Sequence, residues 1–142
     1  MRENLEAKAE VTINAPVSRV WDALVNPEII KRYMFGATVI SDWKVGSPIA
    51  WKGEWKGKPF EDKGRVLEVE RGTRLRYSHF SPLSGAPDRP ENYHTVSIEV
   101  GGLDGKVHVA LSQDNNPTEK AREESQRNWG MMLEGLKKTV ET

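Results

Sequence analysis

Three histidines, His79, His94 and His108, are the side chains of this sequence best suited to metal or acid–base chemistry. A metal ion needs several such side chains to converge on one point. Alternate residues of a strand face opposite sides of a sheet, and the patterns around His79 and His108 put these two on different sides. Their spacing matches no helical zinc motif, and the chain has no cysteine. We therefore expect no metal site and no cofactor.

Tyr77 and His79 form a more promising pair, because residues two apart in a strand share a face. Together they could hydrogen-bond a ligand carbonyl or hydroxyl, or act as a weak acid–base couple. The structural alternatives are that Tyr77 fills core volume and that His79 reaches water at a strand end. The sequence contains no nucleophile with a neighbouring base, no phosphate-binding loop and no dinucleotide fingerprint. We therefore expect binding without catalysis, and keep an enzyme that uses Tyr77 and His79 as an alternative.

The C-terminal segment, Pro117 to Glu141, predicts one long helix that would position these residues. Asn116 can cap its first free N–H groups, and Pro117 suits the first helical position. At a period of 3.6 residues an apolar stripe runs along this helix, formed by Trp129, Met132, Leu133, Leu136 and Val140. Such a stripe indicates packing against another apolar surface.

The same helix face becomes polar toward its N-terminal end, where it carries Arg122 and two further polar residues. This change predicts that the helix seals a core at one end and borders a pocket mouth at the other. There Arg122 could receive a carboxylate or phosphate. The alternative is an ordinary salt bridge with Glu119, Glu123 or Asp114.

Alternating polar and apolar residues predict seven strands, the first over Lys8–Ile13. Two short helices follow, one after Pro16 and one from Asn26 through Tyr33. The other strands are expected at Ala37–Trp43, Pro48–Trp55, Lys58–Glu70, Thr73–Phe80, Tyr93–Val100 and Lys106–Gln113. Short turns favour an antiparallel meander whose apolar face is covered by the terminal helix. The expected fold class is α+β, with a curved antiparallel sheet wrapped around that helix.

The change of character along the helix face predicts a pocket beside the sheet that could hold a small molecule. Burial of apolar area would supply the affinity, and a few polar side chains would orient the ligand. The expected ligand-binding residues are Trp51, Tyr77, His79, Val96, Ile98, Arg122, Trp129, Met132 and Leu133. A rival hypothesis is a protein-interaction module that uses exposed apolar residues, namely Trp55, Phe60 and Met131.

The length and charge balance of the sequence limit the kind of protein this can be. The 142 residues fit a single domain, 1–142. Lys plus Arg and Asp plus Glu each total 21, and this balance argues against a nucleic-acid partner. No segment has the length and apolarity of a membrane span, so we expect a cytoplasmic protein, with a homodimer as a further candidate. The segment Ser81–Asn92 predicts a long loop that is either a lid, an oligomer contact or a surface insertion.

The order of these elements resembles the helix-grip fold of the START-like superfamily, also called SRPBCC. Several motifs are similar to those of the homologues of the activator of the heat-shock-protein-ninety ATPase: Ile13–Leu24, Asn26-Pro27-Glu28, Ser41–Gly46, Gly64–Val69 with Leu75, and Trp129 with Leu133, Leu136 and Lys137. The resemblance implies a cavity that takes small, largely hydrophobic molecules, and it raises a cyclase- or hydrolase-like enzyme and a chaperone partner as alternatives. The family's namesake carries an additional N-terminal domain for which 142 residues leave no room. We therefore expect small-molecule binding in place of chaperone activation.

Overall fold

All elements of the expected fold are present in the computed structural model, which describes residues 5–34, 36–55, 57–82, 85 and 87–141, without the side chains of residues 55 and 103. Along the described chain they are β1 (Leu5–Ile13), α1 (Val17–Val25), α2 (Pro27–Tyr33), β2 (Thr38–Ile40), β3 (Pro48–Trp55), β4 (Lys58–Glu70), β5 (Arg74–His79), the 3-10 helix η2 (Pro90–Asn92), β6 (His94–Leu103), β7 (Lys106–Asn116) and α3 (Glu119–Glu141). The predicted α+β class, a sheet that grips a C-terminal helix, is confirmed.

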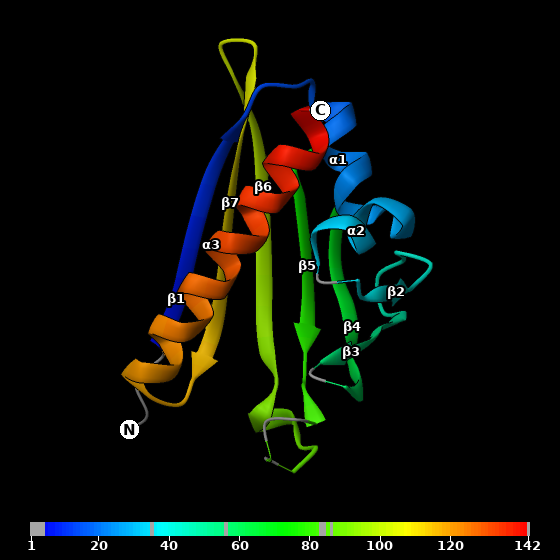
Figure 1. Ribbon diagram of the computed structural model, residues 1–142, viewed down its shortest axis with the longest axis vertical. Coiled ribbons are helices and arrows are strands. Elements are labelled where there is room, and N and C mark those ends of the chain that lie inside the picture. Colours follow the sequence, from blue (N-terminus) through cyan, green and yellow to red (C-terminus); the bar gives the residue numbers. More distant parts are fainter. Residues whose placement is uncertain (1–4, 35, 56, 83–84, 86, 142) are drawn as a thin grey trace.

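One antiparallel sheet contains the strands in the order β1-β7-β6-β5-β4-β3-β2. β2 to β7 form the expected meander, because each of these strands pairs antiparallel with the next strand along the chain. β1 extends the sheet beyond β7, with Val11 opposite Val109. Figure 1 shows the sheet behind α3, and α1 and α2 beside the C-terminal end of α3.

α3 begins later than the sequence predicts, because β7 continues through Asn116. The Asn116 side chain is buried there, and its Nδ2–H donates to the carbonyl oxygen of Leu5 at 2.9 Å. Thr118 caps α3 instead, since its Oγ1 accepts the N–H of Ala121 at 3.0 Å. The prediction that Asn116 caps this helix was therefore wrong. The asparagine serves the contact between β1 and β7.

β2 is shorter than the predicted strand because two local turns follow it. The Oγ of Ser41 accepts the N–H of Trp43 at 3.1 Å, and Asp42 Oδ1 accepts the N–H of Lys44 at 2.9 Å. Short polar side chains of this kind compete with the strand ladder for backbone N–H groups. The chain consequently leaves the sheet after Ile40.

The apolar stripe of α3 is buried against the inner face of the sheet, and its buried members are Met132, Leu133, Leu136 and Val140. α3 crosses the sheet obliquely. It starts near the beginning of β1 and the end of β7 and runs toward α1 (Figure 1). α1 and α2 lie over another part of the inner face, beside the C-terminal half of α3 (Figure 1). Within the described residues, no helix combines the length and apolarity needed to cross a membrane.

Two glycines within α3 differ in their surroundings. A Cβ at Gly135 would lie 3.2 Å from the Cβ of Tyr33 in α2, whereas a Cβ at Gly130 would meet nothing within 4 Å. Alanine is more favourable than glycine inside a helix by about 1 kcal/mol. We expect Gly130→Ala to raise the free energy of unfolding by about this amount, and Gly135→Ala to raise it less because α2 and α3 must separate slightly. Urea unfolding measures both changes, and equal gains would argue against the close approach of these helices.

Candidate functional site

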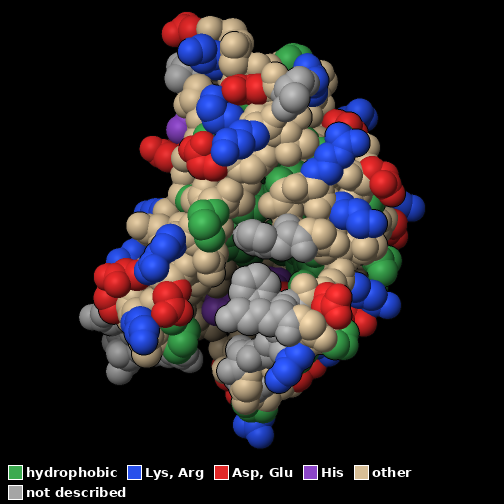
Figure 2. Space-filling view, viewed as in Figure 1, with side chains coloured by type: hydrophobic (Ala, Val, Ile, Leu, Met, Phe, Trp, Pro, Cys, Tyr) green, Lys and Arg blue, Asp and Glu red, His purple; other side chains and the backbone are tan. Residues whose placement is uncertain are grey.

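A pocket of about 150 Å³ lies between α3 and the inner face of β3, β4 and β5. Its lining consists of Met34, Ala37, Trp51, Glu54, Phe60, Asp62, Tyr77, His79 and Trp129. The space-filling view is hollowed beside α3, and histidine is visible in the hollow (Figure 2). Aromatic side chains supply most of the wall, and a few acidic and imidazole groups supply its polar part. This combination is typical of sites for small molecules.

Strand pairing brings Asp62 and His79 together. Asp62 on β4 lies directly opposite Trp51 on β3. In the pairing of β4 with β5, Gly64 falls opposite His79. Asp62, two residues from Gly64, is therefore a diagonal neighbour of His79 on the same face. The imidazole Nε2 lies 2.9 Å from Asp62 Oδ2, and this is a hydrogen bond that joins the two strands across the pocket wall.

The Asp62–His79 pair is largely enclosed, with side chains that are 17% and 22% exposed. Asp62 Oδ1 and His79 Nδ1 are buried and have no hydrogen-bond partner among the described residues. A buried polar atom without a partner costs about 1–3 kcal/mol. A ligand or an ordered water that reached these two atoms would recover that cost.

Tyr77 and Trp51 form an aromatic wall next to this pair. Their ring centroids are 5.1 Å apart, and the Trp51 ring also lies 5.1 Å from the His79 ring at an interplanar angle of 70°. Burial raises the pKa of the Tyr77 phenol well above its ordinary value. Tyr77 therefore stays protonated at neutral pH, and it can donate a hydrogen bond but cannot act as a base.

Trp129 reaches the pocket from α3, and a buried glutamine orients it. The indole Nε1–H donates to Oε1 of Gln113 on β7. A buried indole N–H needs such an acceptor. This bond holds the helix side of the pocket to the sheet.

The predicted ligand-binding residues divide into four groups. Trp51, Tyr77, His79 and Trp129 line the pocket. Ile98 and Met132 surround an adjoining void of about 20 Å³, which also touches Trp51 and Tyr77. Val96 and Leu133 belong to the hydrophobic core and not to the pocket wall. Arg122 forms the fourth group.

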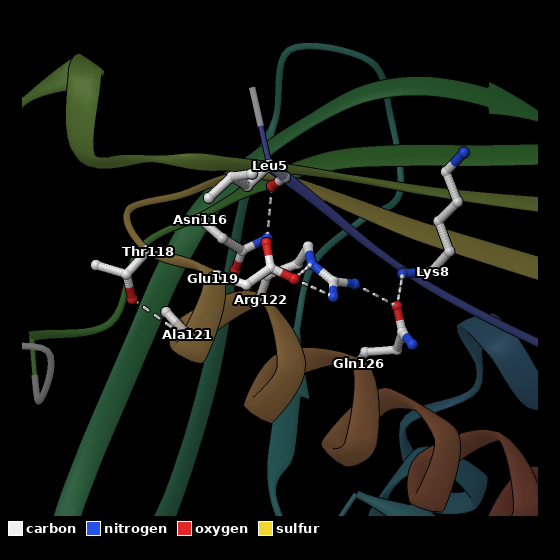
Figure 3. Close-up of polar contacts among 8 residues, drawn as sticks. All are labelled: Leu5, Lys8, Asn116, Thr118, Glu119, Ala121, Arg122 and Gln126. Atoms are coloured by element: carbon white, nitrogen blue, oxygen red, sulfur yellow. Dashed lines mark hydrogen bonds and ion pairs between the residues drawn. The ribbon is translucent and has the colours of Figure 1, made fainter. Parts of the chain in front are cut away.

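Arg122 does not line the pocket. Its guanidinium donates to Glu119 Oε1 at 2.7 Å and to Gln126 Oε1 at 3.0 Å. Gln126 also accepts the backbone N–H of Lys8 on β1, as Figure 3 shows. The pairing with Arg122 lowers the pKa of the Glu119 carboxyl. The ion pair with Glu119 is the structural alternative that the sequence offered for Arg122. Through Gln126 and Lys8, the polar end of α3 is also held against β1.

Sequence interpretation missed Asp62 as a site residue and gave Phe60 another role. Alternation along β4 places Phe60 and Asp62 on the same face as the buried Val66, so an acidic residue on an apolar strand face was a detectable sign. Phe60 was assigned to an exposed interaction surface, and the structure places it, partly buried, on the pocket wall. The Trp55 side chain lies outside the described residues, and Met131 is exposed.

The other histidines do not line the pocket. The Nδ1–H of His94 donates to the carbonyl oxygen of Asp114 at 2.9 Å, and its ring lies 6.3 Å from that of His79. His108 contacts the exposed Glu10. In the part of the chain that the structure describes, no three His, Asp or Glu side chains are grouped so that they could hold a metal ion.

Within the predicted loop Ser81–Asn92, of which residues 83, 84 and 86 lie outside the described residues, Asp88 is held to the sheet. Asp88 forms an ion pair with Lys63 of β4 and accepts the hydroxyl of Tyr93 at 2.6 Å. Lys63, and to a smaller extent Tyr93, lowers the pKa of the Asp88 carboxyl, which is therefore ionised at neutral pH. A role of this loop as a lid stays a prediction.

A larger hollow, of about 590 Å³, lies on the outer face of β1, β6 and β7. Its wall is rich in charged and hydroxyl side chains, including Glu6, Lys8, Glu10, Ser97 and Glu99. Such a surface is well solvated and offers little apolar area to bury. The smaller aromatic pocket is the better candidate site.

The fold and the pocket define this protein as a helix-grip protein of the START-like class, a fold that often binds ligands. The chain belongs to the family described as Activator of Hsp90 ATPase homolog 1-like protein, whose model matches residues 14–141. A comparison with curated proteins finds no match.

Several solved structures have a similar fold. ChR145 from Cytophaga hutchinsonii is 60% identical, with a TM-score of 0.86 over 99% of this chain and 97% of that chain. Protein CV1439 from Chromobacterium violaceum is 21% identical, with a TM-score of 0.79 over 97% and 98%. The Aha1 dimer from Colwellia psychrerythraea is 18% identical, with a TM-score of 0.74 over 96% of each chain. The last two similarities concern the fold alone.

Proposed function

We propose that this protein is a binding module that holds a small, largely apolar molecule in the pocket between α3 and β3–β5. The observation that carries the proposal is the composition of the wall. Aromatic side chains from three strands and one helix converge on one space, and a single hydrogen-bonded polar pair, Asp62 and His79, lies among them. Apolar surface that enters this space gains about 25 cal/mol per Å².

The volume of the pocket limits its ligand. About 150 Å³ is below the roughly 300–1,000 Å³ of sites for drug-sized molecules. It is close to the volume of about 150 Å³ in which an apolar protein cavity holds benzene. The buried part of the ligand is therefore about the size of one substituted ring. A longer molecule would extend out through the mouth.

Binding fits the pocket better than catalysis does. Asp62 orients the His79 imidazole in the way that a carboxylate orients a general base. However, the described lining contains no Ser, Thr or Cys that could serve as a nucleophile, and Tyr77 stays neutral. An enzyme at this site would have to use His79 as a general base toward water or toward a group of its substrate.

Self-association and chaperone binding are not part of this proposal. The dimeric relative is 18% identical, and a similarity at that level concerns the fold. Met131, the exposed apolar residue of α3, is one position, and single exposed apolar residues are ordinary on protein surfaces.

Tryptophan fluorescence tests the proposal. The protein is titrated with one-ring compounds of different charge: toluene, benzyl alcohol, benzylamine and phenylacetate. We expect a saturable change with at least one of them, because Trp51 and Trp129 line the pocket. Trp51→Phe should remove most of this change, whereas Trp21→Phe, a matched change in the buried face of α1, should keep it. A folded protein that responds to none of the four compounds would refute the proposal.

A further inference from the structure

We infer that the ligand of this pocket carries a protonated primary or secondary amine on an apolar, ring-sized body. The inference rests on the proposed function and names the ligand class. Its basis is the conjunction of one largely enclosed carboxylate, two buried polar atoms without partners and several aromatic side chains in one small pocket.

The first step concerns charge. Asp62 contributes a largely enclosed carboxylate to the wall, and the described lining residues include no Lys or Arg. Lys52 and Lys63, on β3 and β4, are held in ion pairs with other carboxylates. A carboxylate or phosphate ligand would therefore face like charge in a partly desolvated space, whereas a cation would be attracted.

The second step concerns hydrogen bonds. A carboxylate oxygen accepts hydrogen bonds, so the 2.9 Å contact with Asp62 Oδ2 is made by a proton on Nε2 of His79. In the tautomer that carries its single proton on Nε2, Nδ1 is an acceptor as well. Asp62 Oδ1 and His79 Nδ1 thus both lack a donor among the described residues. A primary or secondary ammonium group brings at least two N–H donors, whereas a carbonyl or ether brings none.

The third step concerns the walls. The faces of aromatic rings attract a cation within about 6 Å, and they do so most strongly when water is excluded. Trp51 and Tyr77 stand beside the Asp62–His79 pair and offer such faces. Phe60 and Trp129 complete the lining with apolar surface for the body of the ligand. Charge, donors and ring faces therefore favour the same chemical group.

Four compounds that share one ring separate these contributions: benzylamine, benzyl alcohol, phenylacetate and benzyltrimethylammonium. Their dissociation constants for the unmodified protein are measured at pH 7 by following amide chemical shifts. We expect benzylamine to bind at least tenfold more tightly than benzyl alcohol, and phenylacetate to bind most weakly. Benzyltrimethylammonium keeps the charge without N–H donors, and it should bind more weakly than benzylamine.

Two neighbouring variants provide the controls. Asp62→Asn keeps the shape of the side chain and removes its charge, so it should abolish the tenfold preference for benzylamine over benzyl alcohol. Glu61→Gln changes the next residue of β4, a 58% exposed side chain paired with Lys52, and should leave the preference unchanged.

Two results would overturn the inference in different ways. If benzyl alcohol or phenylacetate binds the unmodified protein as tightly as benzylamine, the amine assignment is wrong and the binding proposal stands. If none of the four compounds binds but toluene does, the amine assignment alone is wrong; if toluene also fails to bind, both are wrong. Neither result depends on how well a variant folds.

Discussion

Gly64→Ala is expected to lower the free energy of unfolding by about 3 kcal/mol, the upper part of the range for overpacked interiors. A Cβ at this position would lie 1.7 Å from the carbonyl oxygen of Ser78, a backbone atom of β5. β5 cannot simply move away, because Lys63 and Phe80 exchange two backbone hydrogen bonds next to it, at 2.8 and 3.0 Å. Glycine inside a strand often marks such a close approach of two backbones.

Thermal unfolding measures this effect, and a loss of about 3 kcal/mol corresponds to a fall in Tm of about 10 °C for a chain of this length. Gly101→Ala is the matched control, since Gly101 also lies in a strand and a Cβ there would meet nothing within 4 Å. Similar Tm values for the two variants would show that β4 and β5 are farther apart at Gly64 than described here.

Leu136→Ala is expected to lower the free energy of unfolding by about 2–5 kcal/mol. Leu136 is 0% exposed and lies on the α3 stripe that packs into the main core. Truncation removes buried methyl groups and leaves a cavity that the rigid sheet can fill only in part. In the described chain α3 is the long helix that lies over β1 and β7, at one edge of the sheet, so this contact joins the helix to the sheet (Figure 1).

Urea unfolding followed by circular dichroism measures the cost, with Met131→Ala as the control. Met131 lies on the same helix but is 54% exposed, so its truncation should change the stability by less than about 0.5 kcal/mol. Equal costs at the two positions would mean that α3 does not present the face described here to the sheet.

The strands and their inward faces could be predicted because each depends on residues close together in the chain. Leu75 and Tyr77 alternate with polar residues along β5, and both are buried. The cap of α2 was equally local: Asn26 Oδ1 accepts the N–H of Glu28 at 3.0 Å, and a proline follows the asparagine. Patterns of this kind need no knowledge of the rest of the molecule.

The roles of Asn116 and Arg122 could not be predicted in the same way. The Asn116 side chain binds the carbonyl oxygen of Leu5, which lies at the opposite end of the chain. The polar end of α3 resembled a pocket mouth because the sequence does not show that β1 lies beside it. In the structure the backbone N–H of Lys8 on β1 donates to Gln126 on α3. A polar face predicts that hydrogen bonds will form, and the partner depends on which segments meet.

By itself, the sequence determined the order and type of the elements, their apolar faces and the class of fold, because these follow from periods of two and 3.6 residues along the chain. Only the tertiary structure decided where the pocket lies and that Asp62 would join His79 in its wall. That contact depends on the register of β4 against β5, which is a property of the pair of strands. The sequence of either strand alone does not determine that register.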